Sequence, residues 1–487
     1  MAVTTRRSIA AVSFALVALA APASLDAQTP TAIIRRAVNG IGGEQSVRAV
    51  TNQVTDINSA IFQLGQEETP GSPARATLSF ARIAYDFAGN RYAIQQENRP
   101  VAGPTTRQRR VMANDAGMVV NNTTETPDTR AGIATSMRVM RLSPIALLRT
   151  ALDAPNTLRP AVAKRYRGEL MDGLHIAGRD TATLYFDRGS GLLTVVETLT
   201  DDPILGDRRT TTMYQRWQDA GSVKLPRQVD IEVNGRLSQH QVITSAVVNG
   251  ALADSTFAVT DSIRTRFASA PAAAPLGVTL NELAPGVWRA EGGTHFSLVV
   301  EQPNRLVVIE APLNAQRSRA VLDTLRSRFP SKRVGLAVST HHHWDHAGGV
   351  REYLASGIPI TTHRRNVESV REIGSAPKSV VRDGISRGRA APAVSGVGDS
   401  LTIGTGDSRV VLYRLPSTHA EGILAAYVPN ARLLFVADVL SPAPTLPALG
   451  SQEVVAMVTA AGITVDRVVG AHGGIAPYAD VTRAARP

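Results

Sequence analysis

The stretch from residue 340 to residue 349 carries the clearest chemistry in the chain, because it holds four of the ten histidines. Within it, His341, His343, Asp345 and His346 form the pattern H-x-H-x-D-H, and two glycines follow. An apolar run precedes the pattern, so we expect a loop between a strand and a helix, where side chains converge beyond the strand end. Neutral imidazoles suit Zn²⁺, and a carboxylate adds a hard oxygen ligand. The pattern predicts a metal site.

Three downstream residues of the same chemical kinds stand at the ends of apolar strands. They are His419, Asp438 and His472, which follow the predicted strands 410–415, 433–437 and 468–471. Any one of them alone is an ordinary polar residue at a strand end. In this order after the histidine-rich loop, they extend the predicted metal site.

An H-x-H-x-D-H loop after a strand resembles the signature of the metallo-β-lactamase fold superfamily, whose members are mostly two-metal hydrolases. The later histidines and aspartate have the order and the kind of spacing that this superfamily shows. The resemblance implies two Zn²⁺ ions per chain, one held by His341, His343 and His419, the other by Asp345, His346 and His472, with Asp438 bridging both.

The resemblance also implies the reaction class. A metal-bridging hydroxide would attack the substrate, and Asp345 would orient this nucleophile or shuttle its proton. We expect an exported zinc hydrolase of a small molecule of the ester, thioester, lactone or amide class, with no substrate-binding residue identified. The absence of cysteine excludes metallo-β-lactamases with a cysteine ligand, so a periplasmic β-lactamase of the cysteine-free subclass is one alternative. The other is a lipid- or acyl-chain-binding protein with an accessory metal domain.

Several residues near the motif have secondary roles in this interpretation. Glu310 stands where the superfamily often has an aspartate, and it could accept a hydrogen bond from a ligand imidazole. His342 is expected to point away from the metals, and Trp344 to pack beside the site or contact the substrate. His295 and His363 are candidates for the mouth of the pocket.

The elements that must position these residues fill the C-terminal part of the chain, which we assign to residues 278–487. Strands are predicted at 287–290, 295–300 and 305–310, followed by a helix capped by Asn314. The motif strand, 333–339, comes next. About 210 residues is the usual size of the αββα sandwich of the metallo-β-lactamase superfamily.

A β-rich domain is predicted over residues 28–268. Short alternating runs separated by turn signals favour a curved antiparallel sheet, with helices at 30–50 and 143–153. The runs at 183–187, 191–193 and 221–226 resemble the half-barrel of bacterial lipoprotein-carrier (LolA-like) domains, which implies an apolar ligand. The predicted fold is therefore a two-domain α+β protein with an N-terminal β half-barrel and a C-terminal sandwich.

The remaining sequence features concern export and partners. Residues 1–27 read as a signal peptide, with Arg6 and Arg7 before an apolar run, so we expect a periplasmic or secreted protein exported by either the Sec or the twin-arginine route. The apolar run is too short to span a membrane.

A Pro/Ala linker is predicted at 269–277. The formal net charge is +11, but the arginines are scattered and lack interleaved aromatics, so nucleic acid is not an expected partner. The sequence does not indicate the oligomeric state.

Overall fold

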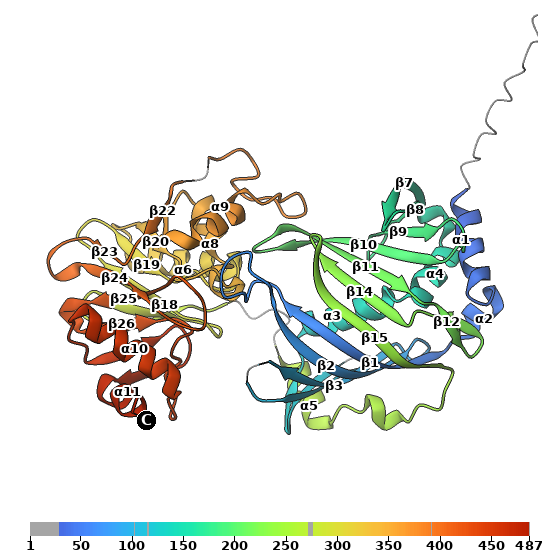
Figure 1. Ribbon diagram of the computed structural model, residues 1–487, viewed down its shortest axis with the longest axis horizontal. Helices are drawn as coiled ribbons and strands as arrows, with labels where there is room; N and C mark the ends of the chain where they lie inside the picture. The colour runs from blue at the N-terminus through green and yellow to red at the C-terminus, as the bar shows by residue number, and fades with distance from the viewer. Residues whose placement is uncertain (1–28, 102, 114–115, 271–275, 391, 487) are drawn as a thin grey trace, which may run out of the picture.

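The computed structural model describes residues 29–486 apart from 102, 114–115, 271–275 and 391. The predicted signal peptide lies outside the described residues, as does most of the predicted linker. The chain forms two regions, a large β-sheet with helices and a smaller layered domain (Figure 1). These are the two α+β domains that the sequence predicted, here called the N-terminal and C-terminal domains.

Over its described residues, the N-terminal domain is built on one sheet of 13 strands, in which all neighbouring strands are antiparallel. From edge to edge the strands are β6 (Thr124–Pro127), β5 (Ala116–Asn121), β4 (Thr106–Ala113), β3 (Arg91–Pro100), β2 (Arg75–Asp86), β1 (Asn52–Gln63), β15 (Arg236–Val248), β14 (Gln228–Val233), β11 (Gly206–Gln215), β10 (Leu193–Asp202), β9 (Ala182–Asp187), β8 (Glu169–Ile176) and β7 (Leu158–Tyr166). β12 (Gln218–Ala220) and β13 (Val223–Leu225) pair separately. The antiparallel sheet was predicted, whereas a half-barrel stays a prediction.

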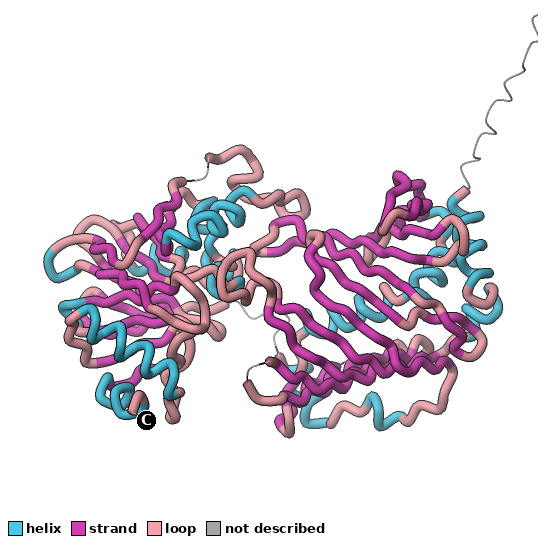
Figure 2. Tube along the Cα trace, viewed as in Figure 1, coloured by secondary structure: helices cyan, strands magenta, loops and turns pink. Residues whose placement is uncertain are grey.

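Helices cover the main apolar face of this sheet (Figure 2). They are α1 (Pro30–Gly40), α2 (Glu44–Ala49), α3 (Arg130–Arg141) and α4 (Pro144–Asp153). The helix predicted at 30–50 is broken in two because Gly42 and Gly43 have φ values of +125° and +89°, which a helix does not allow. α4 lies where a helix was predicted, and α3 was not predicted. On the other face, α5 (Asp261–Ser269) packs Ile263 and Phe267 against strands β2 to β5.

In the part of the C-terminal domain that the structure describes, the strands form two mixed sheets. The first contains β16 (Thr279–Ala284), β17 (Val287–Glu291), β18 (Ser297–Glu301), β19 (Leu306–Ile309), β20 (Val334–Val338), β21 (Ile360–His363) and β22 (Val394–Val397), and it is parallel from β19 onwards. The second contains β23 (Ser400–Ile403), β24 (Val410–Leu415), β25 (Ile423–Val428), β26 (Leu433–Val436), β27 (Arg467–Gly470) and β28 (Ile475–Pro477), with only β26 and β27 parallel.

Alternating apolar residues explain the layers of this domain. Leu298 and Val300 of β18 face the second sheet, while Val299 between them faces the helices on the outer side. The outer helices are α6 (Ala315–Arg328), α8 (Val350–Ala355) and α9 (Val367–Ser375) on the first sheet, and α10 (Ala448–Ala461) and α11 (Tyr478–Ala484) on the second. The sequence prediction of α6 is confirmed at its start, where the Asn314 side chain accepts a hydrogen bond from the Arg317 N–H.

Two hairpins of the large sheet reach the C-terminal domain. The β10–β11 turn places Ile204 in the core cluster between the first sheet and its helices, where its side chain is 7% exposed. The loop between β1 and β2, residues 64–74, contacts the histidine-rich motif. In Figure 1 the tips of both hairpins extend from the sheet toward the C-terminal domain. Among the described residues, no helix is both long and apolar enough to cross a membrane.

Candidate metal centre

The histidine-rich motif forms a tight turn between β20 and α8, with α7 (Trp344–Ala347) inside it. The turn packs directly on the backbone that follows β19, where the Leu313 N–H donates to the Asp345 carbonyl at 2.7 Å. A Cβ on Gly348 would lie 2.0 Å from the Leu313 oxygen, so only glycine fits there. This close approach explains why glycines follow the motif.

The first cluster contains four of the predicted ligands. They are His341, His343, His419 and Asp438, whose ligand atoms all lie within 4.8 Å of one another. The Nε2 of His419 lies 3.0 Å from the Nδ1 of His343 and 3.1 Å from Oδ2 of Asp438. The Nε2 of His341 is buried and has no hydrogen-bond partner among the described residues. A buried nitrogen whose lone pair has no hydrogen-bond partner, close to other potential metal-ligand atoms, fits a bound cation.

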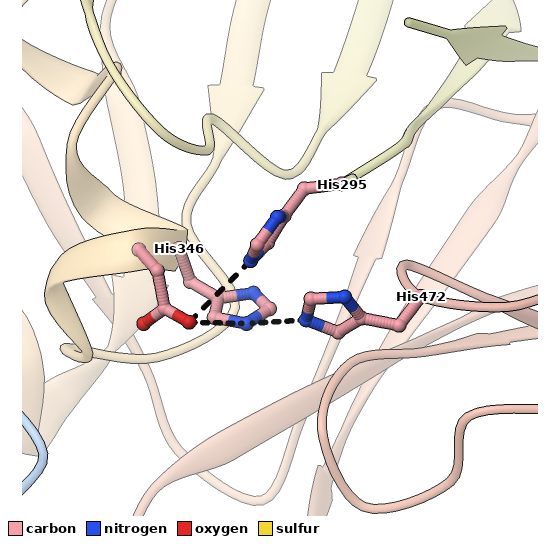
Figure 3. A group of neighbouring side chains, drawn as sticks. His295, His346 and His472 are labelled. Carbon is pink, nitrogen blue, oxygen red and sulfur yellow. Dashed lines mark hydrogen bonds and ion pairs between the residues drawn. The ribbon is translucent and has the colours of Figure 1, made fainter. Parts of the chain in front are cut away.

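The second cluster contains the other predicted ligands and one more histidine. His295, Asp345, His346 and His472 meet the same 4.8 Å criterion, and the three imidazoles converge in Figure 3. The Nε2 atoms of His346 and His472 are 3.1 Å apart, and the Nε2 of His295 lies 3.4 Å from Oδ2 of Asp345. His295 precedes β18 instead of belonging to it, and its isolated position in the sequence did not signal membership of the cluster.

Asp438 lies between the clusters. Its Oδ1 is 2.7 Å from the Nε2 of His346 and 2.9 Å from the Nε2 of His472, both in the second cluster. Its Oδ2 faces the first cluster, 3.1 Å from His419 and 3.8 Å from His341. One carboxylate therefore presents an oxygen to each cluster.

The outer nitrogens of the ligand imidazoles face acceptors, which orients the inner nitrogens toward the clusters. The Nδ1 of His341 lies 3.0 Å from the Thr340 hydroxyl, which donates to Glu310. The Nδ1 of His472 lies 3.2 Å from the Thr294 carbonyl. These contacts leave the Nε2 lone pair of both imidazoles available to a cation.

Glu310 supports both clusters from behind. Its carboxylate is fully buried, with Oε2 accepting from the Thr340 hydroxyl and Oε1 3.5 Å from the Nδ1 of His346. Its backbone has a φ of +85°, a conformation that is unfavourable for a residue with a side chain. The structure thus places Glu310 where the sequence suggested an acceptor for a ligand imidazole.

The electrostatics of the clusters suit a cation. Burial lowers the pKa of His341 well below its ordinary value and that of His343 to about 3, so both imidazoles are neutral at pH 7. Burial opposes protonation of His346, but Glu310 and Asp438 outweigh it and raise its pKa to about 10. Burial alone would raise the pKa of Asp345, but contacts with His295, His346 and Gln66 lower it below its ordinary value. The carboxylates that hold a proton on His346 would equally attract a metal cation, which would replace that proton, because zinc takes neutral imidazoles and ionised carboxylates.

Two of the other highlighted histidines lie in neither cluster. His342 points away from the metal ligands, and its Nε2 is 3.0 Å from the Glu67 carbonyl of the N-terminal domain. His363 is buried and its Nδ1 accepts from the Arg365 N–H, capping a short 3₁₀ helix. Trp344 packs against Gly65 beside the motif. Neither Gln66 nor Glu67, which contact the motif from the N-terminal domain, carries a sequence signal for this role.

Comparisons with known proteins agree on one part of the chain. The family model of the metallo-beta-lactamase superfamily matches residues 290–472, a range that contains both clusters. The 2,4-dinitroanisole O-demethylase subunit alpha of Nocardioides sp. (strain JS1661) is 25% identical over 159 residues, which are 33% of this chain and 45% of that protein. The matched segment thus spans less than half of this relative.

Solved structures similar to the chain include two metallo-β-lactamases. The enzyme from Pontibacter korlensis is 16% identical, with a TM-score of 0.35, and the match covers 43% of this chain and 97% of that one. FIM-1 from Pseudomonas aeruginosa, in its mono-zinc form, is also 16% identical, with a TM-score of 0.35, covering 43% of this chain and 93% of that one.

Proposed function

We propose that the protein is an exported hydrolase with two zinc ions, because residues 290–472 match the metallo-beta-lactamase superfamily and hold two clusters of metal-ligand side chains. The observation that carries the proposal is Asp438, which presents one carboxylate oxygen to each of two adjacent clusters. A shared carboxylate is how a protein holds two cations close together. His341, His343 and His419 would hold one ion, and Asp345, His346 and His472 the other.

Residues of the chain would orient the attacking water and transfer its proton. Zinc bound in these clusters would lower the pKa of a coordinated water toward ~7 and polarise the substrate oxygen. Asp345 has one oxygen held by the Gln66 amide, which leaves Oδ2, beside His295 and His346, to orient the attacking water or accept its proton. His295, 3.4 Å from that oxygen, can relay the proton onward.

The substrate class remains broad in this proposal: an ester, thioester, lactone or amide. The relative from Nocardioides is named for O-demethylation of 2,4-dinitroanisole, which supports a superfamily site that is not restricted to lactams. The alternative is a cysteine-free β-lactamase, which is less favoured because an aspartate, Asp438, stands at the proposed bridging position.

The test is the zinc content of the purified mature protein together with turnover of nitrocefin, a thioester, a lactone and a phosphodiester. We expect about two zinc ions per chain and hydrolysis of one class. Turnover of nitrocefin alone would select the β-lactamase alternative. A protein that takes up no zinc and hydrolyses nothing would contradict the proposal.

A cavity in the N-terminal domain supports a second proposed activity, the binding of an apolar or acyl-chain ligand. The cavity, of about 340 Å³, lies between the sheet and helices α3 and α4, and its lining residues include Ile57, Val196 and Ile243. Gln53 also lines it, and the buried amide oxygen of Gln53 has no hydrogen-bond partner among the described residues. A ligand with an apolar body and one hydrogen-bond donor would suit this lining. All lining residues belong to the N-terminal domain.

Displacement of a fluorescent fatty-acid analogue would test this second activity. Thr212 lines the cavity, so Thr212→Trp should abolish binding by filling it. Leu199→Trp, at a position 44% exposed on β10, should leave binding unchanged. Equal binding by both variants would rule out this cavity as the site.

Export is proposed from the signal-like residues 1–27. Fractionation of the producing cells and N-terminal sequencing of the mature protein would test it. An intracellular protein that keeps residues 1–27 would contradict it.

A further inference from the structure

We infer that the β1–β2 loop of the N-terminal domain is a positioning element of the metal centre, acting through Gln66 and the main chain of Glu67. The inference rests on the proposed metal site and concerns residues outside the domain that the family model matches. It makes the N-terminal domain a structural part of the active site.

The Glu67 carbonyl sets the orientation of one ligand of the first cluster. It lies 2.9 Å from the Nε2 of His343 and 3.0 Å from the Nε2 of His342, and a carbonyl can only accept hydrogen bonds. Both Nε2 atoms must therefore carry the proton. In His343 this leaves the lone pair on Nδ1, the nitrogen that lies 3.0 Å from His419 inside the cluster.

The Gln66 amide acts on a ligand of the second cluster. Its Nε2 donates to Oδ1 of Asp345 at 2.7 Å. The other carboxylate oxygen, Oδ2, stays directed toward His295 and His346. One loop thus contacts one ligand of each predicted metal.

Backbone contacts hold the loop against the motif. The Trp344 N–H donates to the Gly65 carbonyl at 3.1 Å, and the Glu421 N–H donates to the Glu68 carbonyl at 2.7 Å. Arg75, at the start of β2, donates to the carbonyl of the ligand His419 at 2.7 Å. The contacts thus hold the loop to the motif and to the segment that carries His419.

Two features of the loop sequence fit this docking. Gly65 has a φ of +81°, and a Cβ there would lie 2.1 Å from the Trp344 ring. The Glu67 side chain, 3% exposed, forms an ion pair with Arg236 at the start of β15. Removing either feature would displace the carbonyl that His343 contacts.

The experiment compares two glutamine substitutions three residues apart in the full-length chain. Zinc affinity is measured by competition with a chromophoric chelator in wild type, Gln66→Ala and Gln63→Ala. Gln63 is exposed at the end of β1 and serves as the matched control. We expect Gln66→Ala to weaken the affinity for one of the two ions by about 10- to 100-fold, as loss of a ligand's hydrogen-bond partner typically does. Gln63→Ala should match wild type.

Further variants separate positioning from folding. Gln66→Glu keeps the size of the side chain but replaces the donor with a charge facing Asp345, so it should weaken zinc binding further. Gly65→Ala should lower the affinity for both zinc ions because it displaces the whole loop. Circular dichroism checks the fold of each variant, and the Co²⁺ absorption spectrum reports a changed ligand geometry independently of activity.

The outcomes distinguish the two proposals. If wild type binds two zinc ions and Gln66→Ala and Gln66→Glu both behave like Gln63→Ala, the positioning role is overturned while the proposed function stands. If wild type binds no zinc, the proposed function fails and the inference fails with it. Weakened zinc binding in a folded Gln66 variant would support the inference.

Discussion

At the scale of single residues, Asp438 differs from the other proposed ligands because it contacts both clusters. Asp438→Ala should therefore lower the zinc content by more than one ion per chain, whereas His419→Ala should lower it by about one. Hydrolysis should fall by about 10²- to 10³-fold or more in both variants, since electrostatic stabilisation of the transition state is lost. Mass spectrometry would measure the zinc content, and steady-state kinetics would give kcat/KM for hydrolysis. Asp407→Ala, at an exposed position, is the control; retained activity in Asp438→Ala would refute the assignment.

Glu310 tests whether a buried carboxylate outside the ligand set matters. Glu310→Gln keeps the volume but removes the charge that faces Thr340 and His346. We expect zinc affinity to fall by about 10- to 100-fold with little change of fold, because the acceptor that orients the imidazoles is weakened. Chelator competition measures the affinity, and Glu282→Gln, exposed on β16, is the matched control. Affinities equal to wild type would leave Glu310 with a purely structural role.

At the scale of elements, local sequence patterns predicted several of the strands and helices that carry the proposed site. The strand 410–415 is β24 as predicted, and the motif strand, α4 and α6 appear close to their expected positions. Local signals suffice there because each apolar period or cap acts within a few residues. β16 and α3 were missed. Gln66 could not be predicted, since its partner Asp345 is 279 residues away and the contact depends on how the domains dock.

The helix α8, which follows the motif, is tied to the next segment of the chain by Arg351. The guanidinium donates to the Ile373 and Ala376 carbonyls near the end of α9 and to the Asp383 carboxylate at 2.5 Å. Burial alone would raise the pKa of Asp383, but Arg351 and the Ser386 N–H lower it from 3.8 to about 2. The folded-state pKa lies below the unfolded value, so this carboxylate stabilises the fold fully above about pH 4 and loses that effect as the pH falls toward 2.

Asp383→Asn should therefore lower the free energy of unfolding of the C-terminal domain by about 1–3 kcal/mol at pH 7, the usual range for a hydrogen bond to a charged group. The difference from wild type should shrink between pH 4 and pH 3. Urea titrations of both proteins at pH 7, pH 4 and pH 3 would measure the difference in the free energy of unfolding. Asp399→Asn, whose side chain is 84% exposed beside Arg414, is the matched control and should change little. A difference that is independent of pH would contradict the assigned ionisation.

At the scale of the whole molecule, the two domains are held together by two hairpins of one sheet. The β10–β11 turn inserts Ile204 into the C-terminal core, and Asp202 accepts from the Ile204 and Leu205 N–H groups. Beside it, the Asp207 N–H donates to the Pro377 carbonyl at 2.6 Å. The second hairpin is the β1–β2 loop at the metal centre. Because both leave the same sheet, the anchoring of one restricts the position of the other.

Ile204→Ala tests this coupling at a distance from the zinc ligands. Loss of a buried isoleucine should destabilise the protein by about 2–5 kcal/mol. With the anchor weakened, the β1–β2 loop should contact the motif less firmly, so zinc affinity should also fall, by less than in Gln66→Ala. Calorimetry and chelator competition would measure the two effects. Leu199→Ala, at a position 44% exposed on the same hairpin, should change neither. Lower stability with unchanged zinc affinity would mean that each hairpin docks independently, because the metal centre would then not depend on the second anchor.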